Sequence, residues 1–135
     1  MRPTDRAMRT ALAVVFLWFF IGSIAHFVFV EAEMRIVPAY LPWPRAAVLV
    51  SGALEMLGAV ALLWRLTRPI AAWGLFALTL AVTPANIYML QNAELFSSVP
   101  YWALVLRLPL QAGLLLLMAW IALRSRSDQS IDEAA

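Results

Sequence analysis

The chain has 135 residues, of which 64% are hydrophobic and only 13% are charged. Soluble domains usually contain about 45–50% apolar residues, so the composition excludes a soluble globule and predicts an all-α integral membrane protein. All ten cationic residues are arginines spread between the apolar segments, which argues against nucleic-acid binding. Cysteine is absent and His26 is the only histidine, so the chain offers no thiolate chemistry and no metal site is expected.

Four apolar segments follow in chain order, and each is long enough to cross a membrane as a helix. About 20 residues span the hydrocarbon core, and a backbone exposed to lipid must satisfy its own hydrogen bonds. Residues 1–9 are expected to form a cytoplasmic N-terminus, and the polar residues 124–135 a disordered cytoplasmic tail. The expected spans, which together make one transmembrane domain over residues 10–123, are residues 10–30, 46–64, 70–90 and 101–123. They predict a polytopic, antiparallel four-helix bundle.

The connection between the first two spans is rich in proline. Its sequence, EAEMRIVPAYLPWPR, has three prolines that disfavour a continuous helix, and Tyr40 and Trp43 are residue types of the membrane interface. We expect this outer loop either to cover the mouth of the bundle as a lid or to rest among the lipid headgroups.

The arginines predict the orientation in the membrane. Arg35 and Arg45 flank the Pro-rich loop, whereas seven arginines flank the other ends of the spans. Because cytoplasmic loops carry the excess of cations, both termini are expected in the cytoplasm and the protein in a bacterial inner membrane. The seven residues are Arg2, Arg6, Arg9, Arg65, Arg68, Arg124 and Arg126.

Glu55 and Arg107 are the charged residues inside the spans. A charge near the centre of a spanning helix costs roughly 2.5–3.5 kcal/mol on insertion scales, so it usually faces a partner or a cavity. At about 1.5 Å per residue, Glu55 lies about 15 Å and Arg107 about 10 Å below the outer ends of their helices. We therefore predict that Glu55 pairs with Arg107 across the bundle, although such a pair could also serve only to hold helices together.

Three further polar residues, His26, Asn86 and Gln111, fall in the same outer half. Small residues surround Glu55 at helical spacing, and these favour contact with other helices instead of lipid. The concentration of polar groups predicts a cavity, although each group could instead hydrogen-bond only to a neighbouring helix. The candidate ligand-binding residues are His26, Glu55, Asn86, Arg107 and Gln111, and the candidate acid/base pair is His26 with Glu55.

Several motifs resemble the DoxX-like family of small four-helix membrane proteins. They are GSIAHF, RIVPAYLPWP, SGALEMLGAVALLW, TRPIAAWGL and VTPANIYML, which cover residues 22–90, and the fourth span is similar only loosely. The residues that match the family pattern are His26, Pro38, Pro42, Gly52, Glu55, Pro84 and Asn86. The resemblance implies a subunit of a membrane redox complex, and the absence of cysteine implies that any thiol chemistry would come from a partner subunit.

Three functions remain open at this point. The first is a membrane subunit that binds a small lipophilic molecule, such as a quinone, beside a redox partner. The second is an intramembrane acid/base enzyme, similar to an isomerase, that uses His26 and Glu55. The third is an assembly factor for another membrane protein. We expect no cofactor that belongs to the chain itself, and quinone is the one candidate for a bound cofactor. A homo-oligomer is also possible.

Overall fold

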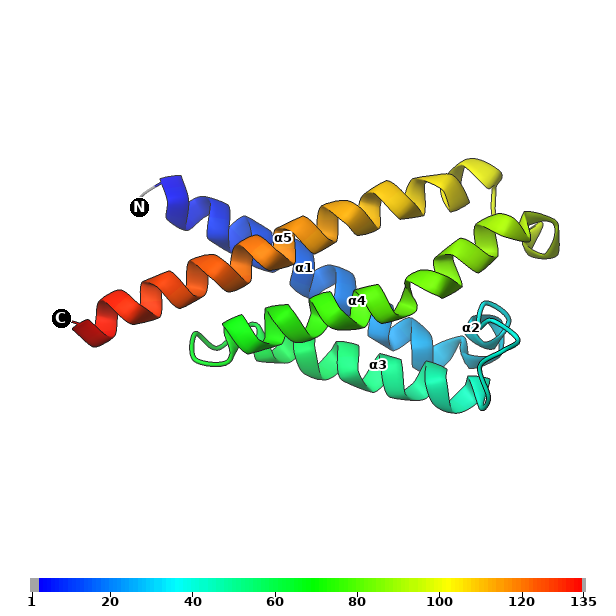
Figure 1. Cartoon of the computed structure of the whole chain (residues 1–135), viewed down its shortest axis with the longest axis horizontal. Coiled ribbons are helices and arrows are strands. Elements are labelled where there is room, and N and C mark those ends of the chain that lie inside the picture. Colours follow the sequence, from blue (N-terminus) through cyan, green and yellow to red (C-terminus); the bar gives the residue numbers. More distant parts are fainter. Residues whose placement is uncertain (1–2, 135) are drawn as a thin grey trace.

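The structure, a computed structural model, describes the backbone of residues 3–134 and the side chains of residues 4–131, and this part of the chain is helical between its turns. By length and composition four helices are long and apolar enough to cross a membrane, which confirms the all-α class and agrees with a membrane protein. These four are α1 (Pro3–Val28), α3 (Pro44–Ala61), α4 (Arg68–Gln91) and α5 (Tyr101–Ala134). The short α2 (Val30–Met34) follows α1, and a 3₁₀ helix (Ala93–Phe96) precedes α5 (Figure 1).

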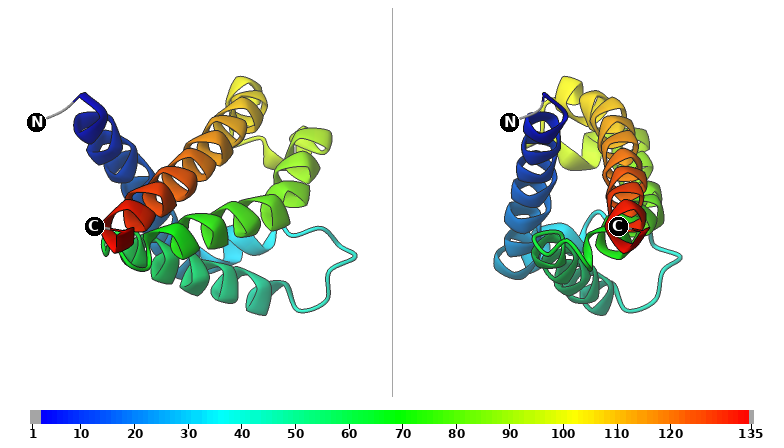
Figure 2. Two further views of the ribbon diagram at one scale, coloured as in Figure 1. Left: turned by 60° about the vertical axis from the view of Figure 1, so that its left-hand side comes forward. Right: turned by 90° about the vertical axis from the view of Figure 1, so that its left-hand side faces the viewer.

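The long helices run between two ends of the molecule. At one end, which we call the terminal end, α1 begins, α5 ends and a short turn joins α3 to α4 (Figure 1). The opposite end, which we call the α2 end, holds α2, the Pro-rich connection and the 3₁₀ helix. Helix α1 packs mainly on α3, and α4 packs mainly on α5. Helices α1 and α5 cross and then separate toward the α2 end (Figures 1 and 2). The two helix pairs therefore enclose space only in the half of the molecule near α2.

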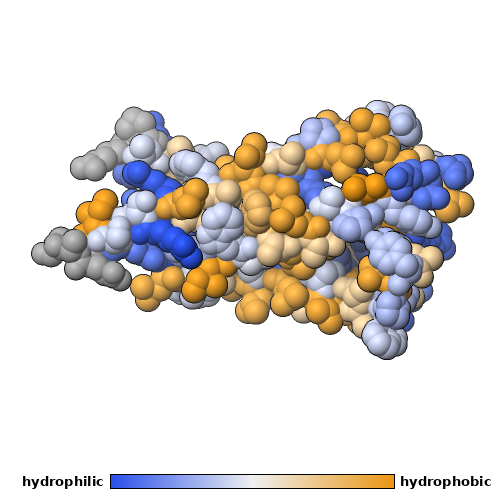
Figure 3. Space-filling view, in the orientation of Figure 1, coloured by the Kyte–Doolittle hydropathy of each residue, from blue (hydrophilic) through white to orange (hydrophobic). Residues whose placement is uncertain are grey.

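The apolar core fills the other half. All four long helices contribute almost fully buried residues to it, among them Val15, Ala59, Leu75, Met118 and Ile121. Hydrophobic residues cover much of the middle of the surface in Figure 3, and hydrophilic residues gather toward the two ends. The core thus holds the helices together at one end, and the surface suits a hydrocarbon environment between two polar zones.

The polar tail was expected to be disordered, and that prediction is wrong for the residues that the structure describes. Helix α5 continues without interruption to Ala134. The Gln129 side chain donates a hydrogen bond to the Arg65 carbonyl at 2.6 Å, and Arg124 forms an ion pair with Asp128 at 3.6 Å. The Gln129 contact attaches the last turns of α5 to the α3–α4 turn, and the ion pair lies within α5 itself. Ala135, like Arg2 at the other terminus, lies outside the described residues.

Two other helix boundaries differ from the expected spans by three residues or more. Helix α1 begins at Pro3 instead of residue 10, and α3 ends at Ala61 instead of residue 64. The Thr67 hydroxyl donates to the Ala61 carbonyl at 2.7 Å and the Arg68 guanidinium donates to the Leu62 carbonyl at 2.9 Å. Side chains from the turn thus satisfy the carbonyls that a longer helix would have used.

The Pro-rich connection has no regular helix between α2 and α3. Residues 35–43 form turns, and Pro44 is the first residue of α3, the position where its missing N–H and fixed φ are tolerated best. Trp43, just before it, has a left-handed backbone with a φ of 56°. Its side chain is exposed, as is that of Tyr40.

Candidate functional site

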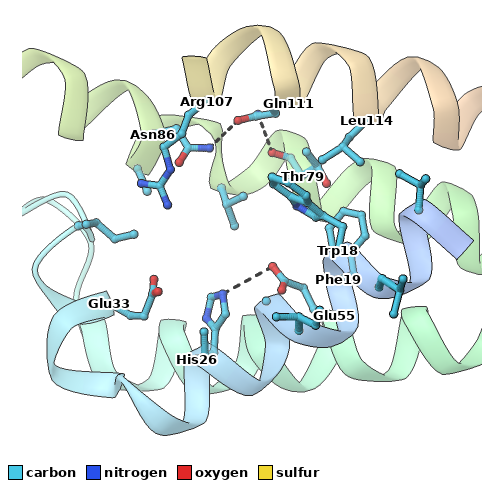
Figure 4. A pocket seen from close by; sticks show the side chains of 18 residues that line it. Trp18, Phe19, His26, Glu33, Glu55, Thr79, Asn86, Arg107, Gln111 and Leu114 are labelled. Atoms are coloured by element: carbon cyan, nitrogen blue, oxygen red, sulfur yellow. Dashed lines mark hydrogen bonds and ion pairs between the residues drawn. The ribbon is translucent and has the colours of Figure 1, made fainter. Parts of the chain in front are cut away.

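A cavity of about 620 Å³ lies between the two helix pairs in the half of the molecule near α2. Its volume is within the range of small-molecule sites, about 300–1,000 Å³. Side chains from α1, α2, α3, α4 and α5 line it (Figure 4). All five candidate residues of the sequence analysis reach this one cavity, namely His26, Glu55, Asn86, Arg107 and Gln111.

His26, near the end of α1, is held by the first turns of α3. Its Nδ1 lies 3.1 Å from the Val48 carbonyl oxygen and 3.3 Å from the Ser51 hydroxyl. Because a carbonyl oxygen can only accept, the contact with Val48 favours the ring form that carries a proton on Nδ1. The other nitrogen, Nε2, then faces Glu55, with 3.7 Å between Nε2 and Glu55 Oε1.

Gly52 allows this arrangement. It lies against His26 where α1 and α3 pack, and a Cβ at residue 52 would be 2.5 Å from the His26 Cβ. Gly22 lies beside Glu55, where a Cβ would make an ordinary van der Waals contact, 3.4 Å from Glu55 Oε2. Gly52 is thus the glycine that lets α1 and α3 approach closely enough for His26 and Glu55 to face each other.

The predicted ion pair between Glu55 and Arg107 is wrong. Glu55 is 8% exposed and the ionisable side chain beside it is His26, whereas Arg107 is exposed and its Nη1 donates to Met89 Sδ at 2.6 Å. The reason is the packing of the helices: α3, which carries Glu55, packs on α1 and α4, while α5, which carries Arg107, packs mainly on α4. Both residues line the cavity, but from different walls (Figure 4).

Gln111 organises the wall formed by α4 and α5. It is buried, its Oε1 accepts from Asn86 Nδ2 at 2.5 Å, and its Nε2 donates to the Thr79 carbonyl at 3.2 Å and to the Thr83 hydroxyl. These contacts use both donors and an acceptor of the amide, so Gln111 positions its neighbours and has little left to offer a ligand. Within the described residues the side-chain amide oxygen of Asn86, Oδ1, accepts no hydrogen bond. Asn86 is therefore the better candidate for ligand contact on this wall.

The sequence analysis missed Glu33 as a site residue. It was assigned to the outer loop, but α2 places it at the edge of the cavity, half-buried, with its carboxylate directed inward (Figure 4). A five-residue helix leaves no clear periodic signal in the sequence, so only the folded chain shows this position. Thr79 also lines the cavity, and its spacing of seven residues from Asn86 puts both on one face of α4.

Apolar side chains complete the lining. Helix α1 contributes most of them, and Leu114 of α5 faces them. Within the described residues, no group of three or more histidine or acidic side chains is arranged to hold a metal ion. The site can therefore offer hydrogen bonds, one imidazole beside one carboxylate, a guanidinium and apolar surface to a molecule of moderate size.

The fold and the cavity are those of a small all-α protein with four candidate membrane spans and a partly polar cavity between its helices. The chain belongs to the family described as Domain of unknown function (DUF8561), whose model matches residues 6–123. The match covers α1 through most of α5, so the cavity lies wholly within the family domain. No curated protein and no solved structure matches the chain.

Proposed function

We propose that the protein binds a small lipophilic molecule with a polar, quinone-like head in this cavity, as a membrane subunit of a redox system. The observation that carries the proposal is the cavity itself, in which hydrogen-bonding groups face each other from two walls within an apolar enclosure. His26 and Glu55 form one polar wall, and Asn86 and Arg107 form the other (Figure 4). The assignment to a redox system rests on the DoxX-like sequence motifs.

A ring with two carbonyl groups suits these walls chemically. Arg107 has N–H groups beyond the one that contacts Met89, and these can donate to one carbonyl oxygen. The His26 and Glu55 pair can hold a proton near the other oxygen, because Nε2 and the carboxylate face each other at 3.7 Å. The chain has no cysteine, so a partner subunit would exchange electrons with the bound ring.

Mass spectrometry of the protein purified in mild detergent tests this function. We expect a lipophilic molecule to co-purify, and its amount to fall several-fold in Arg107→Gln, which removes the cation from the cavity. Arg124→Gln is the matched control, because Arg124 is an exposed arginine of the same helix that does not line the cavity. A wild-type protein that retains only detergent and bulk phospholipid, or equal amounts of ligand in both variants, would contradict the proposal.

A second candidate function is an intramembrane acid/base enzyme of the isomerase type. The observation that favours it is the His26 and Glu55 pair, because an imidazole and a carboxylate that face one cavity can take and return a proton. Turnover of an added isoprenoid, lost in His26→Gln, would select this function over simple binding. A stoichiometric protein partner with no bound molecule would instead select an assembly factor.

We further propose an antiparallel topology in a bacterial inner membrane, with the α2 end facing the periplasm. Arg65 and Arg68 lie in the turn at the terminal end, where α1 begins and α5 ends (Figure 1). Arg35 and Arg45 flank the connection at the other end, so the excess of arginine favours a cytoplasmic terminal end. The Pro-rich connection would then be an outer loop beside the mouth of the cavity.

Reporter fusions test this topology. Alkaline phosphatase, which is active only in the periplasm, is expected to be inactive when fused after Ala135 and active when inserted after Tyr40, and a fluorescent protein at each position should give the opposite pattern. An active phosphatase at the C-terminus would overturn the orientation and place the α2 end in the cytoplasm.

A further inference from the structure

The lining of the cavity changes in chemistry along α1. His26 lies toward the α2 end, with Glu33 beyond it, and the lining residues of α1 before Gly22 are all apolar. From His26 to Val14 there are twelve residues, which corresponds to about 18 Å at about 1.5 Å per residue. The wall of the cavity that α1 forms is therefore polar near α2 and apolar toward the middle of the molecule. The apolar residues of α1 are Val14, Leu17, Trp18, Phe19 and Ile21.

The apolar part of the cavity opens sideways, between α1 and α5. The lining residues Leu17, Trp18 and Ile21 of α1 are 52%, 51% and 63% exposed, whereas Glu55 of α3 and Thr79 of α4 are 8% and 5% exposed. Helices α1 and α5 also diverge toward the α2 end in Figure 1. Because α1 and α5 are both candidate membrane spans, this opening faces the hydrocarbon of the bilayer.

From these observations, and resting on the proposed function, we propose that the ligand is an amphiphile with a polar head and one hydrocarbon chain, which enters from the bilayer between α1 and α5. The head lies between His26 and Arg107, and the chain lies along α1 past Ile21 and Leu17 toward Val14. A ligand that consisted of a head alone would leave the apolar half of the cavity unused.

Contact with membrane lipid alone does not account for these residues. Ile24, on the same helix, is 43% exposed and does not line the cavity, so it is an ordinary lipid-facing side chain. Val14 is similarly exposed, at 47%, but it does line the cavity. A bulky residue at Val14 would therefore fill the proposed site of the ligand's hydrocarbon chain, called the chain site below. The same substitution at Ile24 would change only the lipid-facing surface.

The experiment compares two probes: a dimethoxy-methyl-benzoquinone without a chain, and the same ring with a decyl chain. Each is measured by equilibrium dialysis against the protein in nanodiscs, with protein-free nanodiscs as the reference for partitioning into lipid. In Val14→Trp, a bulky side chain in the apolar half should exclude the decyl chain, so affinity for the decyl probe should fall about tenfold or more. Affinity for the ring alone should change by less than about twofold.

Ile24→Trp is the control, and it should bind both probes as the wild type does. Leu17→Trp is a second filling variant, and a loss of the decyl probe in both filling variants with unchanged melting temperatures supports the proposal. Unchanged binding of the decyl probe in both variants overturns the chain site but leaves the binding function standing. If neither probe binds to the wild type, the quinone-like head is overturned together with the chain site.

Discussion

Gly52→Ala is expected to lower the melting temperature of the protein in detergent and to reduce its ligand content, although it adds a single methyl group. The new Cβ would lie 2.5 Å from His26 Cβ and 3.2 Å from His26 Cγ. The His26 Cβ is fixed to the backbone of α1, so relief requires α1 and α3 to move apart. Overpacking of this kind typically costs about 1–3 kcal/mol, and it would also move the imidazole away from Val48 and Glu55.

Two other glycines provide matched controls for this prediction. A Cβ at Gly74 of α4 would meet nothing within 4 Å, so Gly74→Ala should leave stability unchanged or raise it by up to about 1 kcal/mol through helix propensity. A Cβ at Gly58 would lie 2.7 Å from Leu75 Cδ2 and 2.8 Å from Leu75 Cγ, so the buried Leu75 side chain would have to repack, but the atoms in the way are not fixed to the backbone as the His26 Cβ is. We therefore expect the melting temperature to be highest for Gly74→Ala, lower for Gly58→Ala and lowest for Gly52→Ala. A Gly52→Ala protein as stable as Gly74→Ala would show that α1 and α3 are not in close contact there.

The elements that could be predicted from the sequence are those set by local composition. Four apolar segments gave four long helices because a lipid-exposed backbone has few alternatives. The depth of each polar residue followed from its position along a helix, and that was enough to bring His26, Glu55, Asn86, Arg107 and Gln111 to one cavity. Depth depends only on the rise per residue, which is the same for every helix.

Depth did not decide between Arg107 and His26 as the partner of Glu55. Glu55 and Arg107 lie at similar depths, but a depth does not say which helices pack together. That depends on close contacts such as the one at Gly52, which brings α1 close to α3 and places His26 Nε2 3.7 Å from the carboxylate. The sequence pattern around Glu55 showed that its face contacts a helix, and three helices could have been that neighbour.

The end of α5 shows a second limit. Residues 124–130 are polar, and polarity in an isolated segment is typical of disorder. In the folded chain this segment continues a long helix that is already formed, so each added residue gains a hydrogen bond without a new nucleation step. Gln129 also reaches the Arg65 carbonyl, a contact between residues far apart in the sequence that no local pattern indicates.

His26→Leu and Glu55→Leu are each expected to destabilise the protein, and the double variant is expected to lose less stability than the sum of the two. Glu55 is 8% exposed and His26 Nε2 lies 3.7 Å from Glu55 Oε1. Removal of the imidazole leaves a buried carboxylate without its partner, and such groups are costly. Removal of the carboxylate leaves Nε2 facing an apolar wall. In the double variant neither group remains, so we expect a coupling of about 0.5–3 kcal/mol.

A second cycle, with Arg107→Leu in place of His26→Leu, is the matched control. Arg107 is exposed at the opposite wall and contacts Met89, so its effect should add to that of Glu55→Leu within about 0.5 kcal/mol. Both cycles are measured as free energies of unfolding in the same detergent, and ligand content is measured by mass spectrometry in parallel. A larger coupling of Glu55 to Arg107 than to His26 would contradict the observed geometry. If instead His26 is coupled to Glu55, and His26→Gln keeps the fold but loses the ligand, the pair acts on the bound molecule and does not only join α1 to α3.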